Sequence, residues 1–412
     1  MYEWDFYEDS AVCHPIADAD NLYRGYSTVR KVSGWKLEVQ QFRWNWSNEL
    51  LKLQNALTAM YYGLEGAYEL SEYNRFEIYE RGIPRPITAL RMPDRVVKSV
   101  LNELYLVPDV RKKLIYDNGA SLKDKGVDFA RRRLVAHLES YFREYGTNEG
   151  YVRLTDFSGF YDNIDHRLTM KMIEKYEKDD FARRLVRQAL DSYCIDVSYM
   201  SDSEYQAALR SKFKLMDYRK AGHMNERRGQ KLLYKSLSVG DPTSQIAAIG
   251  YPTGIDKLLT IVHGVKYYER YMDDTAFICR DLSRIKTLGE IFDLAAVRYK
   301  LFINQKKTRI CPIGKTFTFL QFRYRLTETG HVVVRIGKKT IPRIRRRLKK
   351  LAVMIRNGEK GLYRAEELFR SWIGNFRRVM SKVQISEMVD LYRNLFGEGL
   401  DTWLMKKNLL WS

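Results

Sequence analysis

The stretch Tyr151–His166 has the sequence YVRLTDFSGFYDNIDH. Its pattern changes from that of a strand to that of a turn and then a helix, and this change decides the fold. Residues 151–155 have the composition of a short β-strand, which we expect to end at Asp156. Phe157 and Phe160 follow, and an Asn- and Asp-rich turn then leads into a predicted helix. The stretch therefore places a carboxylate at the end of a strand, directly before a turn.

A pair of carboxylates lies at the tip of a second predicted feature, a hairpin over residues 266–279. The tip has the sequence Tyr271-Met272-Asp273-Asp274, and aromatic and β-branched residues flank it. Because successive strand side chains point to opposite faces, the two carboxylates should point in different directions. Turns are rich in Asp for conformational reasons alone, so the pair by itself is weak support for a site.

Together with Asp156, this pair forms a candidate metal site. Adjacent carboxylates that both stay ionised need a cation, and Mg²⁺ prefers carboxylate and phosphate oxygens. A strand carboxylate that faces a hairpin Asp on the neighbouring strand can hold two Mg²⁺ ions about 3.5–4 Å apart. Two such ions stabilise the attacking and leaving oxygens of an in-line displacement at phosphorus. Asp156, Asp273 and Asp274 are therefore candidate catalytic residues and metal ligands.

The composition indicates a folded, basic protein. Its 412 residues correspond to roughly two to three domains. Hydrophobic residues make up 45% and aromatic residues 13% of the chain, which excludes a disordered protein. The 71 Lys and Arg exceed the 51 Asp and Glu, so the net charge is +20. A charge of this size favours a polyanionic partner, and nucleic acid is the usual one.

Features that the sequence lacks bear on location and redox state. No uncharged apolar run reaches the roughly 18 residues of a membrane span. The first twenty residues contain acids and no Lys or Arg, unlike a secretory signal. Cys13, Cys194, Cys279 and Cys311 lie far apart and form no CxxC pair, which disfavours a disulfide framework or a zinc ribbon. We expect a cytoplasmic thiol protein without a membrane partner.

The predicted elements mix short strands with segregated helices, which favours an α+β fold over a doubly wound parallel sheet. Asp94 is a good N-cap residue type and is expected to open a helix. Other helices are expected over 46–80, 127–144, most of 167–232, and from 341–355 to the C-terminus. Strands are expected at 76–78, at 85–89 and within 316–335.

A dense run of positive charge precedes and enters the predicted helix at 341–355. Eight cations and no acid lie between residues 338 and 350. On a helix, such a face can follow a phosphate backbone without distinguishing bases, although a solvated helix face is the alternative. The predicted nucleic-acid-binding residues are Lys338, Lys339, Arg343, Arg345, Arg346, Arg347, Lys349 and Lys350.

Taken together, the two Asp motifs and their surroundings resemble the reverse transcriptases. Tyr271–Asp274 resembles the YxDD motif of that family, and residues 156–166 resemble the motif with its first catalytic Asp. The resemblance covers about residues 76–380, and its motifs occur in the family's order. The remaining motifs are Arg85–Thr88, Asp94–Val97, Ser238–Gln245, the LxxNxxKT pattern at Leu301–Thr308, Phe319–Phe322 and Ser371–Asn375.

The resemblance implies roles for individual residues. Asp156, Asp273 and Asp274 would bind two Mg²⁺ ions, with Mn²⁺ as an alternative, and the Phe157 carbonyl would be a further ligand. Tyr161 would exclude a ribose 2′-OH, unless it is a core tyrosine. Further residues would contact the nucleotide or the primer. The nucleotide-binding set adds Arg85, Val239, Gly240, Gln245 and Lys307, and the primer grip is Phe319, Leu320, Gln321 and Phe322.

For some of these residues a plainer interpretation stays open. Arg85 would reach the triphosphate with its planar guanidinium, or it is a surface charge. Lys307 would lie near the leaving pyrophosphate and donate a proton, or it is a solvated lysine. Gln321 stands where the family usually has Gly, so the primer-grip motif departs from the usual form at this position. His166 is expected to be structural.

The resemblance further implies a right-hand polymerase fold with a helical thumb. Residues 1–45 would be an N-terminal extension, 46–150 the fingers, 151–335 the catalytic palm and 336–412 the basic thumb. The activity would be RNA-directed DNA synthesis from a 3′-OH with dNTPs. The partners would be an RNA template or noncoding RNA and a DNA primer or product, while an accessory protein or a homo-oligomer is left open.

Departures from the usual motifs indicate a subtype. Val239-Gly240 followed by Ser244-Gln245 gives a VGxxxSQ form, whereas group II intron enzymes usually have QGxxxSP. This form resembles enzymes of diversity-generating retroelements and of related defence-associated and uncharacterised bacterial groups. We expect a bacterial or prophage retroelement enzyme. The alternatives are a phage-defence enzyme that uses a noncoding RNA or no template, and a catalytically silent RNA-binding protein. Neither a Cys/His nuclease module nor an RNase H-like domain is expected.

Overall fold

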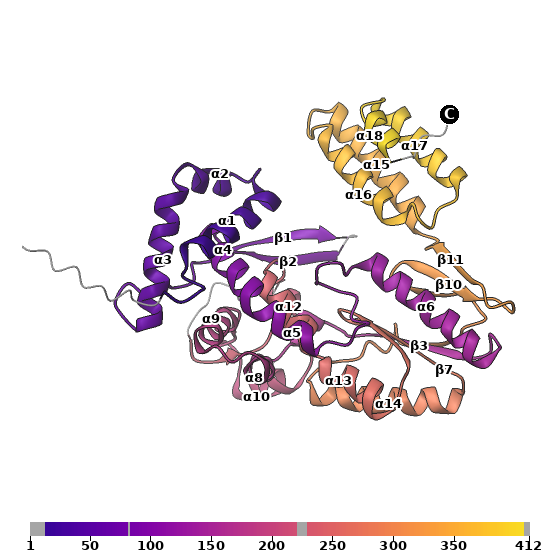
Figure 1. Ribbon diagram of the computed structural model, residues 1–412, viewed down its shortest axis with the longest axis horizontal. Coiled ribbons are helices and arrows are strands. Elements are labelled where there is room, and N and C mark those ends of the chain that lie inside the picture. The colour runs from indigo at the N-terminus through magenta and orange to yellow at the C-terminus, as the bar shows by residue number, and fades with distance from the viewer. Residues whose placement is uncertain (1–12, 81–82, 221–228, 408–412) are drawn as a thin grey trace, which may run out of the picture. The chain divides into compact units, whose positions relative to one another are not determined.

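The computed structural model describes residues 13–80, 83–220 and 229–407 (Figure 1). Helices alternate irregularly with short strands, and the paired strands are antiparallel. The α+β class predicted from the sequence is therefore confirmed. Within these residues, no helix combines the length and the apolar character that crossing a membrane requires.

The chain divides into two compact units, each assembled from three separate segments. The first unit comprises Met1–Tyr116, Phe157–Leu258 and Ile291–Asn304. The second comprises Asp117–Asp156, Leu259–Glu290 and Gln305–Ser412. All three candidate catalytic carboxylates belong to the second unit, so their arrangement is internal to it.

The first unit is mainly helical, and its described residues include two short pairs of antiparallel strands, β1 with β2 and β4 with β5. Its strands are β1 (Asn74–Glu80), β2 (Ile83–Ala89), β4 (Ile195–Asp196) and β5 (Leu232–Leu233). Its helices are α1 (Ala19–Ser33), α2 (Leu37–Trp44), α3 (Trp46–Tyr62), α4 (Met92–Leu101), η1 (Asn102–Leu106), α5 (Val107–Lys113), α7 (Phe160–Asn163), α8 (His166–Tyr176), α9 (Asp180–Asp191), α10 (Asp202–Arg210), α11 (Leu215–Lys220), α12 (Pro242–Gly250) and α13 (Thr253–Lys257). Two elements contribute residues to both units, η3 (Leu258–Val262) and α14 (Leu282–Arg298).

Helix α1 packs tightly against α4 in the first unit. Leu22 and Tyr26 of α1 are buried. A Cβ atom at Gly25 would lie 2.8 Å from a methyl group of Val100 and 3.0 Å from the Val96 carbonyl oxygen. Glycine therefore allows the two helices to approach. The predicted N-terminal extension thus contributes core residues to this unit.

Two expected helix boundaries are wrong. Helix α3 ends at Tyr62, because Gly63 adopts a left-handed φ of 72° that terminates it, so the helix does not continue to residue 80. Helix α4 begins at Met92 with Arg91 as its N-cap residue, because Pro93 suits the first turn. Asp94 lies inside that turn, fully buried, and accepts a hydrogen bond of 2.7 Å from the Tyr68 hydroxyl.

A buried ion pair joins α4 to the start of α12. Lys98 Nζ lies 2.5 Å from Asp241 Oδ2 and 2.8 Å from the Tyr193 hydroxyl oxygen, and the two charged side chains are 3% and 0% exposed. Asp241 also caps α12 by accepting a hydrogen bond from the Thr243 N–H. The backbone N–H of Thr88 in β2 donates to the Val239 carbonyl. These contacts fix the loop that precedes α12.

The second unit contains a central sheet with strand order β6-β7-β3-β8. A separate three-stranded sheet has the order β11-β10-β9. Figure 1 shows the last four helices, in orange and yellow, grouped together. The elements are α6 (Val127–Tyr145), β3 (Tyr151–Asp156), β6 (Tyr267–Tyr271), β7 (Asp274–Cys279), β8 (Arg309–Pro312), β9 (Phe317–Phe319), β10 (Phe322–Leu326), β11 (Val332–Ile336), α15 (Thr340–Arg356), α16 (Tyr363–Phe376), α17 (Lys382–Phe396) and α18 (Asp401–Lys406).

One apolar core connects these elements. Leu134 and Leu138 of α6 pack with Val152 and Leu154 of β3, and the same cluster extends to Phe322 and into the C-terminal helices. The predictions of the helix over 127–144, the hairpin over 266–279 and the helix over 341–355 are confirmed. The core thus supports both the sheet that bears the carboxylates and the sheet of β9–β11.

The buried ion pair generates a stability prediction. Lys98→Met would leave the Asp241 carboxylate buried without its cation, so we expect a loss of about 3–5 kcal/mol in unfolding free energy. The matched control Lys112→Met breaks an exposed pair with Asp109 and should cost about 0–1 kcal/mol. Chemical denaturation of both variants measures the difference. Equal losses of unfolding free energy would show that burial does not increase the contribution of this ion pair to stability.

Candidate active site

The strand pairing brings together two carboxylates that are far apart in the sequence. Strands β3 and β7 pair antiparallel over six residues, from Tyr151 opposite Cys279 to Asp156 opposite Asp274. Directly opposed residues in such a pair have Cα atoms about 4.5–5.5 Å apart. The two carboxylates therefore extend from adjacent positions at the same end of the sheet.

The third carboxylate lies on the tight turn between β6 and β7. Tyr271 pairs with Asp274, so Met272 and Asp273 form the turn. Met272 has a left-handed φ of 54°, an uncommon conformation for a residue with a side chain. The segment before α6 supports this hairpin, because the Gly119 N–H donates a 2.8 Å hydrogen bond to the Arg270 carbonyl. A Cβ at Gly119 would lie 2.9 Å from that of Ala130, so the support depends on glycine.

Asp156 and Asp274 line a cavity of about 260 Å³. Lys307 contributes to the same wall, and Phe319 and Leu320 of the predicted primer grip form another part. The complete lining is Leu154, Thr155, Asp156, Asp274, Thr275, Lys306, Lys307, Arg309, Thr318, Phe319 and Leu320. Residues from four separate motifs of the sequence thus meet at one cavity within the second unit.

The electrostatics of this cavity favour bound cations. Burial, together with the negative charges of Asp273 and Asp156, raises the pKa of Asp274 to about 7. Lys307 Nζ donates to both oxygens of Asp156 at 3.0 and 3.1 Å. Burial lowers the pKa of Lys307, but its hydrogen bond to Asp156 and the surrounding carboxylates outweigh burial and raise it. The ammonium therefore stays charged and partly neutralises the cluster.

The donor set fits a divalent cation better than a lone ammonium. Carboxylate oxygens are the ligands that Mg²⁺ and Mn²⁺ prefer, and like charges on neighbouring carboxylates repel until a cation is present. Among residues 13–80, 83–220 and 229–407, however, no group of three His, Cys, Asp or Glu side chains is arranged to hold a metal ion. The structure brings Asp156 and Asp274 to one cavity and leaves Asp273 on the adjoining turn.

Sequence reasoning missed Arg309 and Thr318 in the cavity wall. Arg309 Nη2 donates a 2.8 Å hydrogen bond to the Thr318 carbonyl, which ties β8 to β9. Arg309 is the first residue of β8, and Lys307 lies in the turn before that strand, so strand alternation in the sequence does not relate the two side chains. Thr318 has no distinguishing signal in the sequence.

The primer-grip motif forms a tight turn between β9 and β10. Phe319 pairs with Phe322 and both are buried, while Leu320 and Gln321 form the turn with φ values of 47° and 73°. Positive φ at both central residues is the geometry of a type I′ turn, which favours Asn and Gly. Gln321 therefore adopts a backbone conformation that suits the glycine usual at this position.

The remaining predicted nucleotide-binding residues lie in the first unit. Arg85 is exposed on β2, and Gln245 is exposed in the first turn of α12. Tyr161 is half-buried, with its ring edge against Phe160. Gly240 has a φ of 111° that other residues rarely adopt. Their roles stay predictions.

Two other predicted residues in this unit are mainly packed in its interior. The ring of Phe157 is buried and stacks on those of Phe160 and Phe292. His166 is also buried, and its Nε2 lies 2.6 Å from the Ser236 carbonyl oxygen. Both side chains therefore pack in the core. The role predicted for Phe157 involves its backbone carbonyl oxygen and not its ring, so that role stays a prediction.

The predicted nucleic-acid-binding residues lie in and just before α15. Ile344 and Leu348 of this helix are buried. Arg345 pairs with Glu387 of α17 at 2.7 Å, whereas the other seven cations are exposed and form no ion pair in the part of the chain that the structure describes. The exposed set consists of Lys338, Lys339, Arg343, Arg346, Arg347, Lys349 and Lys350.

Comparison with known proteins identifies a family. Residues 80–324, more than half of the chain, match the family described as reverse transcriptase (RNA-dependent DNA polymerase). No curated protein sequence matches the chain. One similar solved structure is telomerase from Candida albicans in complex with a TWJ fragment of telomeric RNA. The identity is 13% and the TM-score 0.42, over 81% of this chain and 61% of that chain.

The turn between β9 and β10 generates a stability prediction. Gln321→Gly should raise the unfolding free energy by about 1 kcal/mol, because glycine adopts positive φ without the strain of a Cβ. The control Arg325→Gly, in the middle of β10, should instead lower it by about 0.5–1 kcal/mol. Thermal denaturation of the two variants gives the comparison. A loss at Gln321 as large as that at Arg325 would contradict the strain argument.

Proposed function

The chain belongs to the reverse transcriptase family, and from this premise we propose that it is an RNA-directed DNA polymerase. It would extend a 3′-OH end with deoxynucleoside triphosphates along an RNA template. The observation that carries this proposal is the pairing of Asp156 with Asp274 across β3 and β7, with Asp273 on the adjoining turn. Three carboxylates at one end of a sheet support transfer of a nucleotidyl group.

The residues proposed to hold two Mg²⁺ ions, or Mn²⁺, are Asp156, Asp273 and Asp274, with the Phe157 carbonyl as a further ligand. Bound ions would supply Lewis-acid stabilisation of the attacking and leaving oxygens. The chain itself contributes rigidity, because Asp156 and Asp274 are the last and first residues of hydrogen-bonded strands. Groups fixed in this way need little rearrangement as charge develops.

Lys307 is proposed to act on the leaving pyrophosphate. Its side chain is 65% exposed, so the ammonium can turn from Asp156 toward a phosphate group without unpacking the core. Its raised pKa keeps Nζ protonated, so the side chain stays a cation. Lys307 would thus neutralise the pyrophosphate and donate a proton to it.

Other parts of the chain would bind the substrates. Arg85, Val239, Gly240 and Gln245 of the first unit are proposed to contact the nucleotide or template, and Tyr161 to exclude the ribose 2′-OH. The exposed cations at residues 338–350 would bind backbone phosphates. In this proposal residues 46–150 form the fingers, 151–335 the palm and 336–412 the thumb of a right-hand polymerase.

The biological role is proposed from the loop before α12. The VGxxxSQ form at Val239–Gln245 supports a bacterial or prophage retroelement of the diversity-generating type, acting in the cytoplasm. Genes beside the coding sequence test this role. A pair of template and variable repeats would support it, whereas a lone locus with a structured noncoding RNA would favour phage defence.

The polymerase proposal predicts the effect of removing the turn carboxylates. Asp273→Ala with Asp274→Ala should abolish dNTP incorporation, because these groups are proposed to hold the metal ions, while RNA binding stays within about twofold. A control, Asp281→Ala with Glu290→Ala, removes two exposed acids and should leave incorporation unchanged. Primer extension on an RNA template, beside a binding assay, measures both effects. Full extension by the first variant would contradict the polymerase assignment.

The placement of Tyr161 predicts a change in sugar selection. Tyr161→Ala should increase incorporation of ribonucleotides relative to deoxyribonucleotides, because the ring is proposed to occupy the space of a 2′-OH. Tyr161→Phe keeps the ring and should keep the selectivity. Incorporation of each nucleotide type at matched concentrations gives the ratio. An unchanged ratio in an active Ala variant would remove Tyr161 from the sugar pocket.

A further inference from the structure

Helix α7, which carries Tyr161, is a single turn of four residues, Phe160–Asn163. A helix this short forms few internal hydrogen bonds, because the first four N–H groups and the last four carbonyls of any helix lack partners within it. Gly159 precedes the turn with a left-handed φ of 58°, and Ile164 after it is extended. The position of α7 within the first unit therefore depends on contacts with other segments.

The side chain of Asn163 ties α7 to Phe213, a residue far along the chain. Asn163 is 2% exposed. The Phe213 N–H donates to Asn163 Oδ1 at 2.7 Å, and Asn163 Nδ2 donates back to the Phe213 carbonyl at 3.0 Å. The same Nδ2 also donates to the Gly159 carbonyl at 2.8 Å. The amide thus uses both of its donor hydrogens and its acceptor, and it exchanges hydrogen bonds with Phe213 as an antiparallel strand residue would.

Phe213 lies in the segment between α9 and α12, which the structure describes over residues 192–220 and 229–241. This α9–α12 segment has an apolar core of its own, which joins Phe213 to Ile195, Val197 and Leu233. Ile195 of β4 and Leu233 of β5 are also register partners. Both the segment and α7 belong to the first unit. The partner of Asn163 is therefore held in place by packing that does not involve α7.

Lys235 fastens the end of α10 beside Phe213. Its Nζ donates to the Ala208 carbonyl at 2.6 Å and to the Ser211 carbonyl at 3.1 Å. The last carbonyls of a helix lack partners within it, and a cation there also interacts favourably with the helix dipole. The same ammonium lies 5.6 Å from the centre of the Phe213 ring, within the range of a cation–π contact. Phe213 is therefore fixed by its apolar core and by α10.

Two further hydrogen bonds connect the α9–α12 segment to α7. The Leu237 N–H donates to the Tyr161 carbonyl at 2.9 Å. The Leu215 N–H donates to Asp162 Oδ2 at 3.3 Å. Together with Asn163, three successive residues of the turn are bonded to one segment. A displacement of α7 relative to that segment would have to break these bonds.

The tether and the tyrosine ring lie on different sides of α7. Tyr161 and Asn163 are two positions apart, which corresponds to about 200° around a helix of 3.6 residues per turn. The Tyr161 ring is half-buried and has its edge against Phe160. The α9–α12 segment therefore holds the back of the turn, while the ring extends from its other side. Because the side chain moves with its backbone, the tether controls where the ring lies.

We propose that Asn163 is a positioning residue for sugar selection, because its paired hydrogen bonds with Phe213 set the location of the Tyr161 ring. This inference rests on the proposed function, in which that ring excludes a ribose 2′-OH. It assigns part of the selectivity to the α9–α12 segment. When the pair is lost, α7 can shift and the ring leaves room for the hydroxyl. Ribonucleotides should then be incorporated more readily relative to deoxyribonucleotides.

The test compares ribonucleotide with deoxyribonucleotide incorporation by the full chain, at matched concentrations on an RNA template. Asn163→Ala removes all three hydrogen bonds and should raise the ratio about tenfold or more, because shape discrimination against one group is worth roughly 10- to 200-fold. Asn163→Ser is a milder change, is too short to bridge both atoms of Phe213, and should act in the same direction. The control Tyr205→Phe loses a 3.0 Å hydrogen bond to the Leu232 carbonyl in the same segment and should leave the ratio unchanged.

The ratio is insensitive to a simple loss of folded protein, because both nucleotide types are measured on one preparation. An unchanged ratio in an active Asn163 variant would overturn the proposal. A double variant shows whether Asn163 acts through Tyr161. Tyr161→Ala already removes the ring, so adding Asn163→Ala should change its ratio by less than about twofold. If the two effects multiply instead, Asn163 influences the sugar by another route and the proposal is overturned.

Hydrogen exchange followed by mass spectrometry gives a readout that needs no catalysis. Because the Leu237 N–H donates to the Tyr161 carbonyl, displacement of α7 in Asn163→Ala should make this amide exchange several-fold faster. Tyr205→Phe should leave the exchange at Leu237 unchanged. Unchanged exchange in Asn163→Ala would overturn the tether.

The two readouts separate this inference from the polymerase function. If the original protein incorporates neither nucleotide type, the polymerase function is overturned, and the sugar role of Asn163 falls with it even where exchange is faster. If the original protein extends primers and the Asn163 variants keep its ratio, only the role of Asn163 is overturned.

Discussion

Six residue pairs join β3 to β7, and the last pair sets Asp156 opposite Asp274. Because side chains alternate along a strand, a slip of one residue would turn one of these carboxylates to the other face and expose the apolar residues between them. Val152 and Leu154 of β3 pack against α6, so the hydrophobic core enforces the register. The geometry of the candidate active site is therefore a consequence of core packing at residues that have no chemical role.

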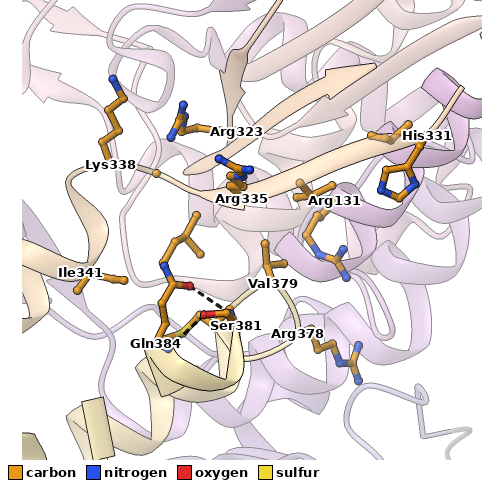
Figure 2. Close-up of a pocket in the computed structure, with 15 residues that line it drawn as sticks. Arg131, Arg323, His331, Arg335, Lys338, Ile341, Arg378, Val379, Ser381 and Gln384 are labelled. Carbon is orange, nitrogen blue, oxygen red and sulfur yellow. Dashed lines mark hydrogen bonds between the residues drawn. The ribbon is translucent and has the colours of Figure 1, made fainter. Parts of the chain in front are cut away.

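Negative charge characterises the catalytic cavity of the second unit. Asp156 and Asp274 line this cavity, and they repel each other and Asp273 on the adjoining turn, with Lys307 as a neighbouring cation, which favours metal ions. Elsewhere in this unit, Arg323 and Arg335 are directly opposed across β10 and β11 (Figure 2), where like charges repel. A polymerase substrate brings both a metal-binding triphosphate and a phosphate backbone.

Local sequence patterns predicted much of the fold and part of the site. The strand before Asp156, the hairpin at Tyr271–Asp274 and the amphipathic helix over 341–355 follow from periodicity and turn composition, which act over a few residues. The helix boundaries near Gly63 and Asp94 could not be predicted from these local patterns. Gly63 ends a helix whose pattern continues, and Asp94 is buried against Tyr68 from a distant segment. Such outcomes depend on contacts that no local pattern contains.

The sequence by itself determined the identities of the carboxylates, the order of the motifs and the excess of positive charge. It determined these because they are properties of residues and their neighbours in the chain. Only the tertiary structure decided that Asp156 and Asp274, separated by more than one hundred residues, are register partners, and that Arg323 and Arg335 are directly opposed across β10 and β11. Pairing between strands is set by the packing of a whole core, and that packing sums many weak contacts over the entire unit.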